Sequence, residues 1–321
     1  MKAIINTEYG SPDLLELREI DKPDVDAGDV LVRVRASSVN PLDWHLMRGL
    51  PYIARLMGLG LRKPKGTVRG VDVAGHVEAV GEDVTQFQVG DEVFGGCDGA
   101  FAEYVCGPEK KFVHKPAGLT FEQAAALPIA GCTALQALRD HGRLQAGQTV
   151  LINGAAGGVG TFAVPIAKAL GAEVTGVCST RNVEMVRSLG ADHVIDYTQD
   201  DFTDGQRYDL ILDAVANRSL SDLRRALSPT GTLVIVGGGS GKWLGPFVVL
   251  LQALVRSRFV SQRLHFFMAN VNNEDLAALA ALVESGKVTP VIDRTYPLNE
   301  TAEAIRYLET GHARGKTVIT V

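Results

Sequence analysis

The chain has 321 residues, of which 46% are hydrophobic, so its length and composition allow about two domains that each bury a sizeable core. A formal net charge of −5 with no long run of like charge argues against a nucleic-acid partner. The four cysteines are scattered and show no C-x-x-C spacing, which argues against a disulfide framework or a zinc cluster and fits a reducing cytoplasm.

The first 120 residues predict a β-rich domain, because short apolar runs alternate with turn formers. One helix, Pro41–Arg48, interrupts them. The predicted strands are Lys2–Asn6, Leu14–Glu19, Val30–Val39, Val71–Val80, Glu92–Phe94, Ala102–Cys106 and Phe112–Lys115. Many short strands separated by turn signals indicate a barrel-like or sandwich architecture.

From residue 121 the pattern changes to alternating helices and strands, which predicts a doubly wound parallel sheet with right-handed crossovers. The expected helices include Phe121–Leu127 and Thr133–Arg139. The expected strands lie at Val150, Glu173–Cys178, His193–Ile195, Asp209–Asp213, Thr232–Val236 and Arg263–Phe267. A last segment, with helices Asn273–Ser285 and Thr301–Thr310 and strands near Val291 and at Thr317–Val321, is expected to return to the first domain.

No membrane segment is predicted. The N-terminus lacks the basic and apolar regions of a signal peptide. The apolar run Trp243–Val255 is interrupted by polar and turn-forming residues and is too short to span a bilayer, so we expect a buried or interface helix there. These features predict a cytoplasmic protein with no membrane partner.

The stretch Thr149–Gly160 predicts a strand, a tight turn and a helix. Glycines let the backbone turn sharply and approach a ligand, and the free amides of a first helical turn attract a pyrophosphate. The letters match the dinucleotide fingerprint G-x-G-x-x-G at Gly157 and Gly160 but carry Ala155 at its first glycine. A simple tight turn therefore stays open as an alternative to a dinucleotide site.

The end of the second strand of this pattern favours NADP(H) over NAD(H). An acidic residue for the ribose 2′-hydroxyl is expected about 20 residues after the glycines, and none is present. Ser179, Thr180, Arg181 and Asn182 stand there instead, and hydroxyls with a guanidinium suit a 2′-phosphate. The alternative is that Arg181 is only a solvated charge at the start of the helix Asn182–Leu189.

Five motifs spread over almost the whole chain match one known family. They are Ser38–Asp43, Gly70–Gly81 with its continuation to Gly95, Leu127–Pro128 with Gly131–Ala137, Gly190–Tyr197, and His312–Lys316. On these residues the chain resembles the zinc-independent, zeta-crystallin-like quinone oxidoreductase branch of the medium-chain dehydrogenase/reductase superfamily. The resemblance implies an α/β fold in which a GroES-like β-rich catalytic domain (residues 1–120 and 269–321) and a Rossmann domain (residues 121–268) share an active-site cleft.

The resemblance also bears on metal binding. The positions that match the catalytic zinc ligands of zinc-using relatives are Asn40, Val71 and Ile129, and these side chains do not form a zinc site. The cysteine-rich lobe that holds a structural zinc in such relatives is absent from the sequence. We therefore expect no bound metal.

The same resemblance assigns candidate site residues. It places Asn40 and Asp43 under the substrate pocket, and Tyr52 is the nearby phenol that could donate a proton, although a packing role for Tyr52 and a turn-capping role for Asp43 stay open. It implies that NADP(H) contacts Ala156, Gly157, Gly158 and Val159 at the pyrophosphate, Ser179, Arg181 and Tyr197 at the adenosine phosphate end, Thr133, Val215, Val236 and Phe266 on the nicotinamide side, and Lys316 in addition.

Without a Lewis acid, the expected acceptors are those that take a hydride unaided, namely quinones and enones. The apolar segment Gly49–Lys65 is a candidate substrate-facing flap, which favours a bulky hydrophobic substrate. An enoyl-thioester reductase of the same fold, or a non-catalytic NADPH-binding sensor or structural protein, stays open. The strand Arg263–Phe267 is expected at a sheet edge, and because an exposed apolar edge is unsafe in a monomer we expect a homodimer.

Overall fold

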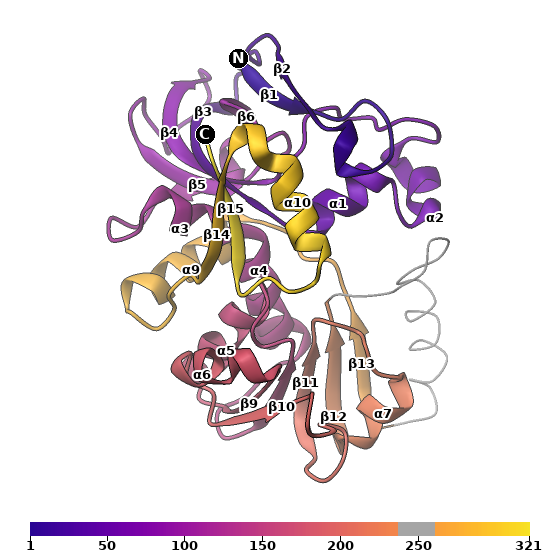
Figure 1. Ribbon diagram of the computed structural model, residues 1–321. Coiled ribbons are helices and arrows are strands. Elements are labelled where there is room, and N and C mark those ends of the chain that lie inside the picture. The colour runs from indigo at the N-terminus through magenta and orange to yellow at the C-terminus, as the bar shows by residue number, and fades with distance from the viewer. Residues whose placement is uncertain (237–260) are drawn as a thin grey trace. The chain divides into compact units, whose positions relative to one another are not determined.

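The computed structural model describes residues 1–236 and 261–321 (Figure 1). The predicted helix at Trp243–Val255 lies outside these residues. The chain divides into two compact units, the first formed by Met1–Cys132, Asn270–Gly286 and Pro290–Val321, and the second by Thr133–Ala269 and Lys287–Thr289. Internal contacts thus group residues 121–132 with the first unit, whereas the predicted domains group them with the second; the predicted boundaries stay a prediction. In the described part of the chain, no helix has the length and apolarity that crossing a membrane requires.

The first unit is built on a seven-stranded sheet that joins the two ends of the chain. The strand order is β14-β15-β3-β4-β5-β7, with β6 also paired to β3, and β1 and β2 form a separate two-stranded sheet. The strands are β1 (Lys2–Ile5), β2 (Glu16–Glu19), β3 (Asp29–Val39), β4 (Asp72–Val80), β5 (Glu92–Gly96), β6 (Tyr104–Pro108), β7 (Phe112–His114), β14 (Ile292–Pro297) and β15 (Lys316–Thr320). β15, from the C-terminal segment, pairs with β3 of the N-terminal part.

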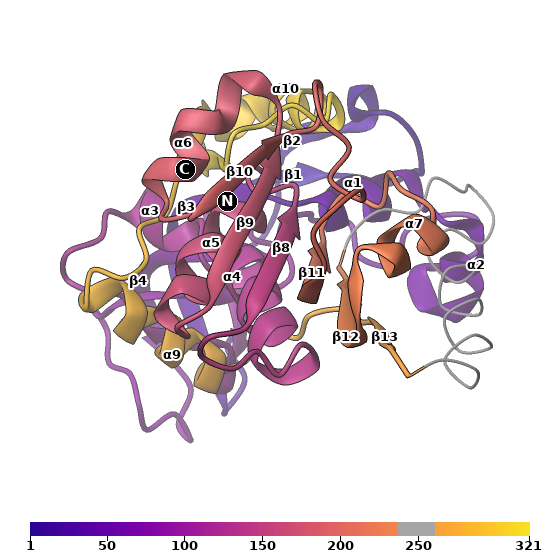
Figure 2. The same cartoon turned by 90° about the horizontal axis from the view of Figure 1, so that it is seen from below.

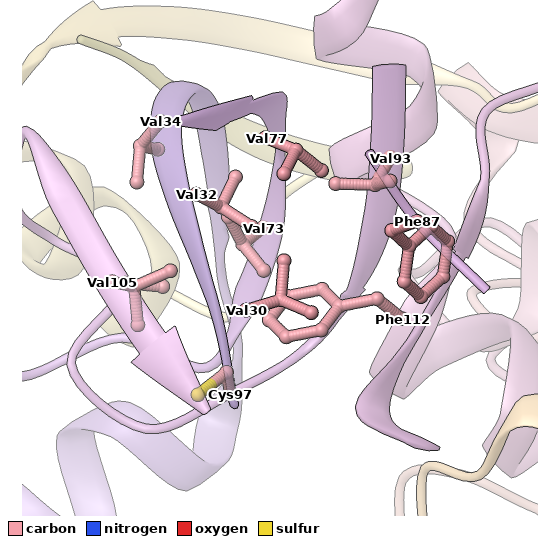
Figure 3. Packing of buried hydrophobic residues seen from close by; sticks show 11 residues of the cluster. Val30, Val32, Val34, Val73, Val77, Phe87, Val93, Cys97, Val105 and Phe112 are labelled. Atoms are coloured by element: carbon pink, nitrogen blue, oxygen red, sulfur yellow. The ribbon is translucent and has the colours of Figure 1, made fainter. Parts of the chain in front are cut away.

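The core of this sheet follows from the alternating side chains of its long strand β3. Val30, Val32 and Val34 are buried and belong to one cluster with Val73 and Phe112, which come from β4 and β7. Figure 3 shows these side chains gathered together. Burial of branched apolar side chains on one face fixes the register of β3, since a slip of one residue would turn them toward the other face.

The helices of the first unit are, in chain order, α1 (Pro41–Arg48), α2 (Tyr52–Ala54), α3 (Phe121–Ala125), the first part of α4 (Pro128–Gln136), α9 (Asn273–Glu284) and α10 (Thr301–Glu309). The boundary between the two units falls within α4. The range predicted for α1 agrees with the observed one. Pro41 at its first turn and the left-handed Gly49 (φ 62°) at its end explain why both ends were recognisable from sequence.

The second unit contains a six-stranded parallel sheet, as the alternating pattern predicted (Figure 2). Its strands are β8 (Thr149–Asn153), β9 (Glu173–Cys178), β10 (His193–Asp196), β11 (Tyr208–Asp213), β12 (Leu227–Ile235) and β13 (Arg263–Phe266), and its helices are α5 (Gly160–Ala169), α6 (Val183–Ser188) and α7 (Leu220–Arg225). The order β10-β9-β8-β11-β12-β13 reverses direction between β8 and β11. Ligands of doubly wound sheets bind at such a switch point, at the carboxyl ends of the strands.

Two elements begin well before their predicted ranges. The helix expected at Thr133–Arg139 begins earlier, as α4, and continues into a π-helical turn at Ala137–His141. Pro128 starts it because its fixed φ and missing N–H suit a first helical position. The strand expected at Thr232–Val236 begins earlier too, at Leu227, because β12 extends through the polar residues before the apolar run.

Candidate functional site

Asp72 is the centre of a buried polar cluster in the first unit. Its side chain has no solvent exposure. Oδ2 accepts hydrogen bonds from Ser38 Oγ (2.5 Å), Asn40 Nδ2 (2.7 Å) and Lys316 Nζ (3.4 Å), and Oδ1 accepts one from the backbone N–H of Ile129 (2.9 Å). A buried carboxylate is costly unless it is paired and hydrogen-bonded, and here both oxygens are satisfied.

Strand pairing brings these distant residues together. Ser38 pairs with Asp72 in the register of β3 and β4, and Thr317 pairs with Val39 in the register of β15 and β3. The residues next to that second pair, Lys316 and Asn40, therefore lie side by side.

Lys316 is held inside the cluster by three acceptors. Nζ donates to Asn40 Oδ1 at 2.6 Å, to the carbonyl of Val39 at 3.3 Å and to Asp72. The residue is 3% exposed. Burial lowers the pKa of Lys316, and the nearby Asp72 carboxylate opposes this effect. The ammonium thus balances the charge of Asp72 at a buried position.

Asp43 occupies the first turn of α1 and has one oxygen without a partner. Oδ2 accepts the backbone N–H of Asn40 at 2.7 Å, which is the capping role considered for it. Oδ1 is buried and makes no hydrogen bond. Burial raises the pKa of Asp43 to about 7, the hydrogen bond from Asn40 acts in the opposite direction, and the charge of Asp72 adds to the rise. Near neutral pH the carboxyl group therefore holds a proton in part of the molecules.

The donor set around Asp72 does not fit a zinc ion. Of the positions expected to match zinc ligands, Ile129 presents its N–H to Asp72, and Asn40 bridges Asp72 and Lys316 through its amide. Zinc sites use thiolates, imidazoles and free carboxylate oxygens, whereas an ammonium repels a cation. Within residues 1–236 and 261–321, no three His, Cys, Asp or Glu side chains form a group that could hold a metal.

Tyr52, the third predicted catalytic residue, lies in α2. Its ring contacts the guanidinium of Arg55, 4.8 Å from the ring centre, and the same guanidinium lies 4.2 Å from the ring centre of Tyr9. Arg55 also donates to the carbonyl of Gly49 at 2.8 Å. These contacts tie the segment after α1 to the N-terminal part of the unit.

In the second unit, three glycines of the turn between β8 and α5, Gly154, Gly157 and Gly160, have different structural roles. Gly154 has φ +87°, so the left-handed position falls one residue before Ala155, which explains why an alanine is tolerated there. A Cβ atom on Gly160 would lie 2.1 Å from the carbonyl oxygen of Gly154, so this position requires close packing. A Cβ atom on Gly157 would meet only that same oxygen, at 3.4 Å, which leaves the backbone there open to a ligand.

The predicted cofactor-binding residues of the second unit lie in this turn or at the carboxyl ends of the parallel strands. Ala156 and Gly158 follow β8, and Val159 directly precedes α5. Ser179, Arg181, Tyr197, Val215, Val236 and Phe266 lie at the carboxyl ends of β9, β10, β11, β12 and β13, and Thr133 lies on α4. This is the edge at which a dinucleotide binds in such sheets, so the residues present fit one. Lys316, assigned to the same group, belongs to the first unit, where it joins the Asp72 cluster; its contact with the cofactor stays a prediction.

The pairing of neighbouring strand ends shows how some of these residues lie relative to one another. Cys178 pairs with Asp196 in the register of β9 and β10, and the N–H of Tyr197 donates to the carbonyl of Cys178 at 3.1 Å. Ser179 and Tyr197 therefore leave the sheet at adjacent points. Val215 lies close to the glycine turn, because a Cβ atom on Gly154 would meet its Cγ2 at 2.6 Å.

Two buried side chains that the sequence analysis did not single out shape the switch point. Asn153, at the end of β8, donates to Asp213 Oδ1 at 2.9 Å, and the same oxygen accepts the N–H groups of Val215 and Ala216. Asp213 thereby fixes the loop after β11. The sequence signal was a polar residue at the end of each apolar strand. The signal for Asp72 was similar, a single acid beginning an apolar strand.

Comparisons with known proteins agree with both units. Residues 26–117 match the model of the alcohol dehydrogenase GroES-like domain, and residues 189–319 match that of a zinc-binding dehydrogenase. The chain is 33% identical to the chloroplastic quinone-oxidoreductase QR1 of Triphysaria versicolor, over 99% of this chain and 98% of that protein. It is 34% identical to a chloroplastic NADPH-dependent alkenal/one oxidoreductase of Arabidopsis thaliana, over 99% of this chain and 79% of that protein.

Solved structures give the same assignment. The quinone oxidoreductase from Coxiella burnetii superposes with a TM-score of 0.87 at 33% identity, covering 100% of this chain and 99% of that one. The α/β class, with a GroES-like domain and a parallel Rossmann-type sheet, is thereby confirmed. On this evidence of sequence and structure, the chain belongs to the quinone oxidoreductase branch of the medium-chain dehydrogenase/reductase superfamily, a group of oxidoreductases.

Proposed function

We propose that this protein is an NADPH-dependent reductase that transfers a hydride to a quinone or an α,β-unsaturated carbonyl compound without a metal ion. The observation that carries the proposal is the buried cluster around Asp72, in which Lys316 provides a fixed positive charge and Asp43 keeps one carboxyl oxygen free. Because a reduced quinone or enone needs a proton and not a Lewis acid, this cluster suits such acceptors.

The choice of NADPH rests on the carboxyl end of β9. Ser179 and Arg181 stand where an NAD-binding chain carries an acid, and Tyr197 leaves the sheet beside them. When bound, NADPH supplies the hydride. Gly157 leaves room for the pyrophosphate, and Gly160 keeps α5 close to the sheet so that its first turn presents free amides.

The chain's own residues divide the remaining tasks. Asn40 and Lys316 position each other, and all three Nζ donors of Lys316 are used inside the cluster, so their role is to hold charge and geometry. Asp43 holds a proton at Oδ1 and gives it to the acceptor after hydride addition, which yields the quinol or the saturated ketone. The carboxylate of Asp43 then regains a proton from solvent.

The test measures the rate of NADPH oxidation, monitored by absorbance, with a small quinone such as 1,4-naphthoquinone as the acceptor and EDTA present. The same assay is run with NADH. We expect turnover in the presence of EDTA and faster reaction with NADPH. The activity should fall as the pH rises through about 7, because Asp43 loses its proton there. In Asp43→Asn, which keeps an acceptor for the N–H of Asn40, kcat should fall and this limb of the pH profile should disappear.

Other outcomes separate the rival functions. Turnover abolished by EDTA would contradict the metal-free proposal. Reduction of an enoyl thioester but of no quinone or free enone would indicate an enoyl-thioester reductase. NADPH binding without turnover of any acceptor would indicate a sensor or structural protein. A cytoplasmic location and a homodimeric state are further parts of the proposal.

A further inference from the structure

A cavity of about 80 Å³ opens beside α1 in the first unit, apart from the Asp72 cluster. Its walls include Tyr9, Leu46, Leu59, Lys65 and Arg69. A water molecule in the liquid occupies roughly 30 Å³, so the space accommodates a group of a few heavy atoms. The wall combines apolar side chains with two cations, Lys65 and Arg69, which suits an anionic group on a hydrophobic body.

Arg69 is the unusual member of this wall, because it is a buried cation that forms no direct ion pair with any described acid, although the charges of Asp43 and Asp98 act on it from a greater distance. The residue is 7% exposed. Nε donates to Asn6 Oδ1 at 3.0 Å and Nη2 donates to the carbonyl of Gly66 at 2.8 Å, both of which are uncharged acceptors. In the described residues, Arg69 forms no ion pair and Nη1 donates no hydrogen bond. Nη1 is therefore exposed to solvent, because a buried Nη1 would be an unsatisfied donor and it is not one.

The surrounding sequence strengthens the positive potential. Between Asp43 and Asp72 the chain carries six Lys or Arg residues and no Asp or Glu. Of these, Arg48 is neutralised by Glu309, whereas Arg62, Lys63 and Lys65 form no ion pair with any residue that the structure describes. Fixed positive charge on a partly enclosed, low-dielectric wall attracts anions strongly. A guanidinium with a free edge is the preferred partner of a planar carboxylate.

The cavity is linked to the candidate catalytic residue through α1. Leu46 lies three residues after Asp43, which places both on the same side of the helix, about one turn apart. Burial lowers the pKa of Arg69, and the charge of Asp43 acts against this effect, so the two groups interact. Asp43 itself is buried and does not line the cavity, so an acceptor whose acidic group binds there would have to extend along α1 toward Asp43.

We propose that Arg69, assisted by Lys65, binds a carboxylate group of the acceptor, so that the preferred substrates are enones or quinones that carry a carboxylate. This inference rests on the proposed function. The sequence analysis predicted only a bulky hydrophobic substrate from the apolar segment at residues 49–65. The carboxylate site adds a preference for negatively charged substrates. Neutral acceptors are expected to react through the same chemistry but with a higher KM.

The experiment compares 4-oxopent-2-enoate, an enone with a carboxylate, with its methyl ester. The quantity measured is the ratio of kcat/KM for the acid to kcat/KM for the ester, in the wild type and in Arg69→Gln, Lys65→Gln and Arg62→Gln. Dividing the ratio of each variant by that of the wild type cancels the different intrinsic reactivities of acid and ester. Arg62 is the matched control, since it is a neighbouring exposed cation outside the cavity wall.

We expect the ratio to fall about tenfold to a hundredfold in Arg69→Gln, through KM and not kcat, because a charged hydrogen bond is lost. A smaller fall is expected in Lys65→Gln, where the replaced side chain is exposed so that the fold is kept, and none in Arg62→Gln. Unchanged ratios in both cavity variants, with the ester still reduced, would overturn the carboxylate site and leave the reductase function standing.

If the wild type reduces neither compound, the site is tested by binding alone. The probe is 4-oxopentanoate, the saturated acid, titrated calorimetrically into the wild type and the three variants. Binding that is lost in Arg69→Gln and kept in Arg62→Gln would support the anion site while the reductase function fails. Absence of binding to the wild type would overturn the site as well.

Discussion

Nζ of Lys316 donates a 2.6 Å hydrogen bond to Oδ1 of Asn40 although the two residues are 276 positions apart in the chain. The contact exists because β15, near the C-terminus, pairs with β3, near the N-terminus. The first unit is therefore closed by the polar cluster around Asp72, and a change in the last strand reaches the first helix. The stability of the unit and the geometry of this cluster are coupled at this point.

The coupling predicts that Lys316→Met is strongly destabilising. Removing the ammonium leaves the carboxylate of Asp72 buried without its counter-charge, and breaking one partner of a buried pair costs about 3–5 kcal/mol. Denaturant unfolding measures this loss. The double variant Lys316→Met with Asp72→Asn removes both charges and should be less destabilised than the sum of the single variants. Additive losses would show that the two charges do not interact.

A second prediction concerns the pH dependence of stability. The folded protein raises the pKa of Asp43 from 3.8 to about 7, so the folded state binds a proton more tightly than the unfolded chain. The resulting stabilisation is complete below the unfolded pKa and is lost as the pH rises through about 7. Between pH 5 and pH 8 this group should remove about 2–3 kcal/mol of unfolding free energy.

The matched variant for this prediction is Asp43→Asn, which cannot titrate and keeps an oxygen for the N–H of Asn40. The difference in unfolding free energy between variant and wild type should therefore shift in favour of the variant as the pH rises. The unfolding free energy of each protein is measured by urea titration at pH 5 and at pH 8. An equal change in unfolding free energy between these two pH values in both proteins would contradict the raised pKa.

The helices and strands of this fold were predicted from the sequence more completely than the buried cluster around Asp72. The range of β9 agrees with the prediction, because Glu173–Cys178 is an apolar, β-branched run with clear boundaries. Asp72 was not predicted to be central, since the partners of its side chain lie 34, 32, 57 and 244 residues away. Strand register brings Ser38, Asn40 and Lys316 to it, and α4 brings Ile129. Register between distant strands depends on the packing of the whole sheet, and local periodicity does not encode it.

The glycine turn shows a similar limit. Letter matching aligned Ala155 with the first glycine of the fingerprint, which made the motif look incomplete. The structure places the left-handed residue at Gly154, so the turn is complete with a spacing of three residues between Gly154, Gly157 and Gly160. The φ value of a residue depends on its turn geometry, which a fixed spacing pattern does not describe.

Two glycine-to-alanine substitutions in this turn should have different effects, one on the stability of the fold and the other on NADPH binding. Gly160→Ala should destabilise the fold, because its Cβ would lie 2.1 Å from the carbonyl oxygen of Gly154 and 2.6 Å from Cα of Ala155. Gly157→Ala should change the unfolding free energy by about 1 kcal/mol or less but weaken NADPH binding roughly tenfold, because the new methyl group faces the approach of the pyrophosphate. Urea unfolding and fluorescence titration with NADPH measure the two effects. Normal NADPH affinity in Gly157→Ala would count against the assigned pyrophosphate position.

The oligomeric state gives another prediction. β13 is the last strand of its sheet and pairs with β12 on one side in the described part of the chain. We expect two copies of the chain to associate through this edge, since an unpaired apolar edge promotes association. Light scattering at micromolar concentration should give twice the chain mass of 34.3 kDa. A monomeric mass that persists at higher concentration would contradict the expectation.

Arg181 provides the test of cofactor choice. It lies just after β9, on an exposed position beside Ser179, and its guanidinium is expected to bind the 2′-phosphate of NADPH. In Arg181→Gln the KM for NADPH should rise roughly tenfold or more while the KM for NADH stays nearly constant, because only NADPH loses a charged hydrogen bond. Arg187→Gln is the matched control, since Arg187 is an exposed arginine on the neighbouring α6 that pairs with Glu184. An equal rise in the KM for NADPH and for NADH would indicate that Arg181 supports the loop structure. If the KM for both cofactors is unchanged in both variants, the phosphate site would be assigned to Ser179 and Tyr197.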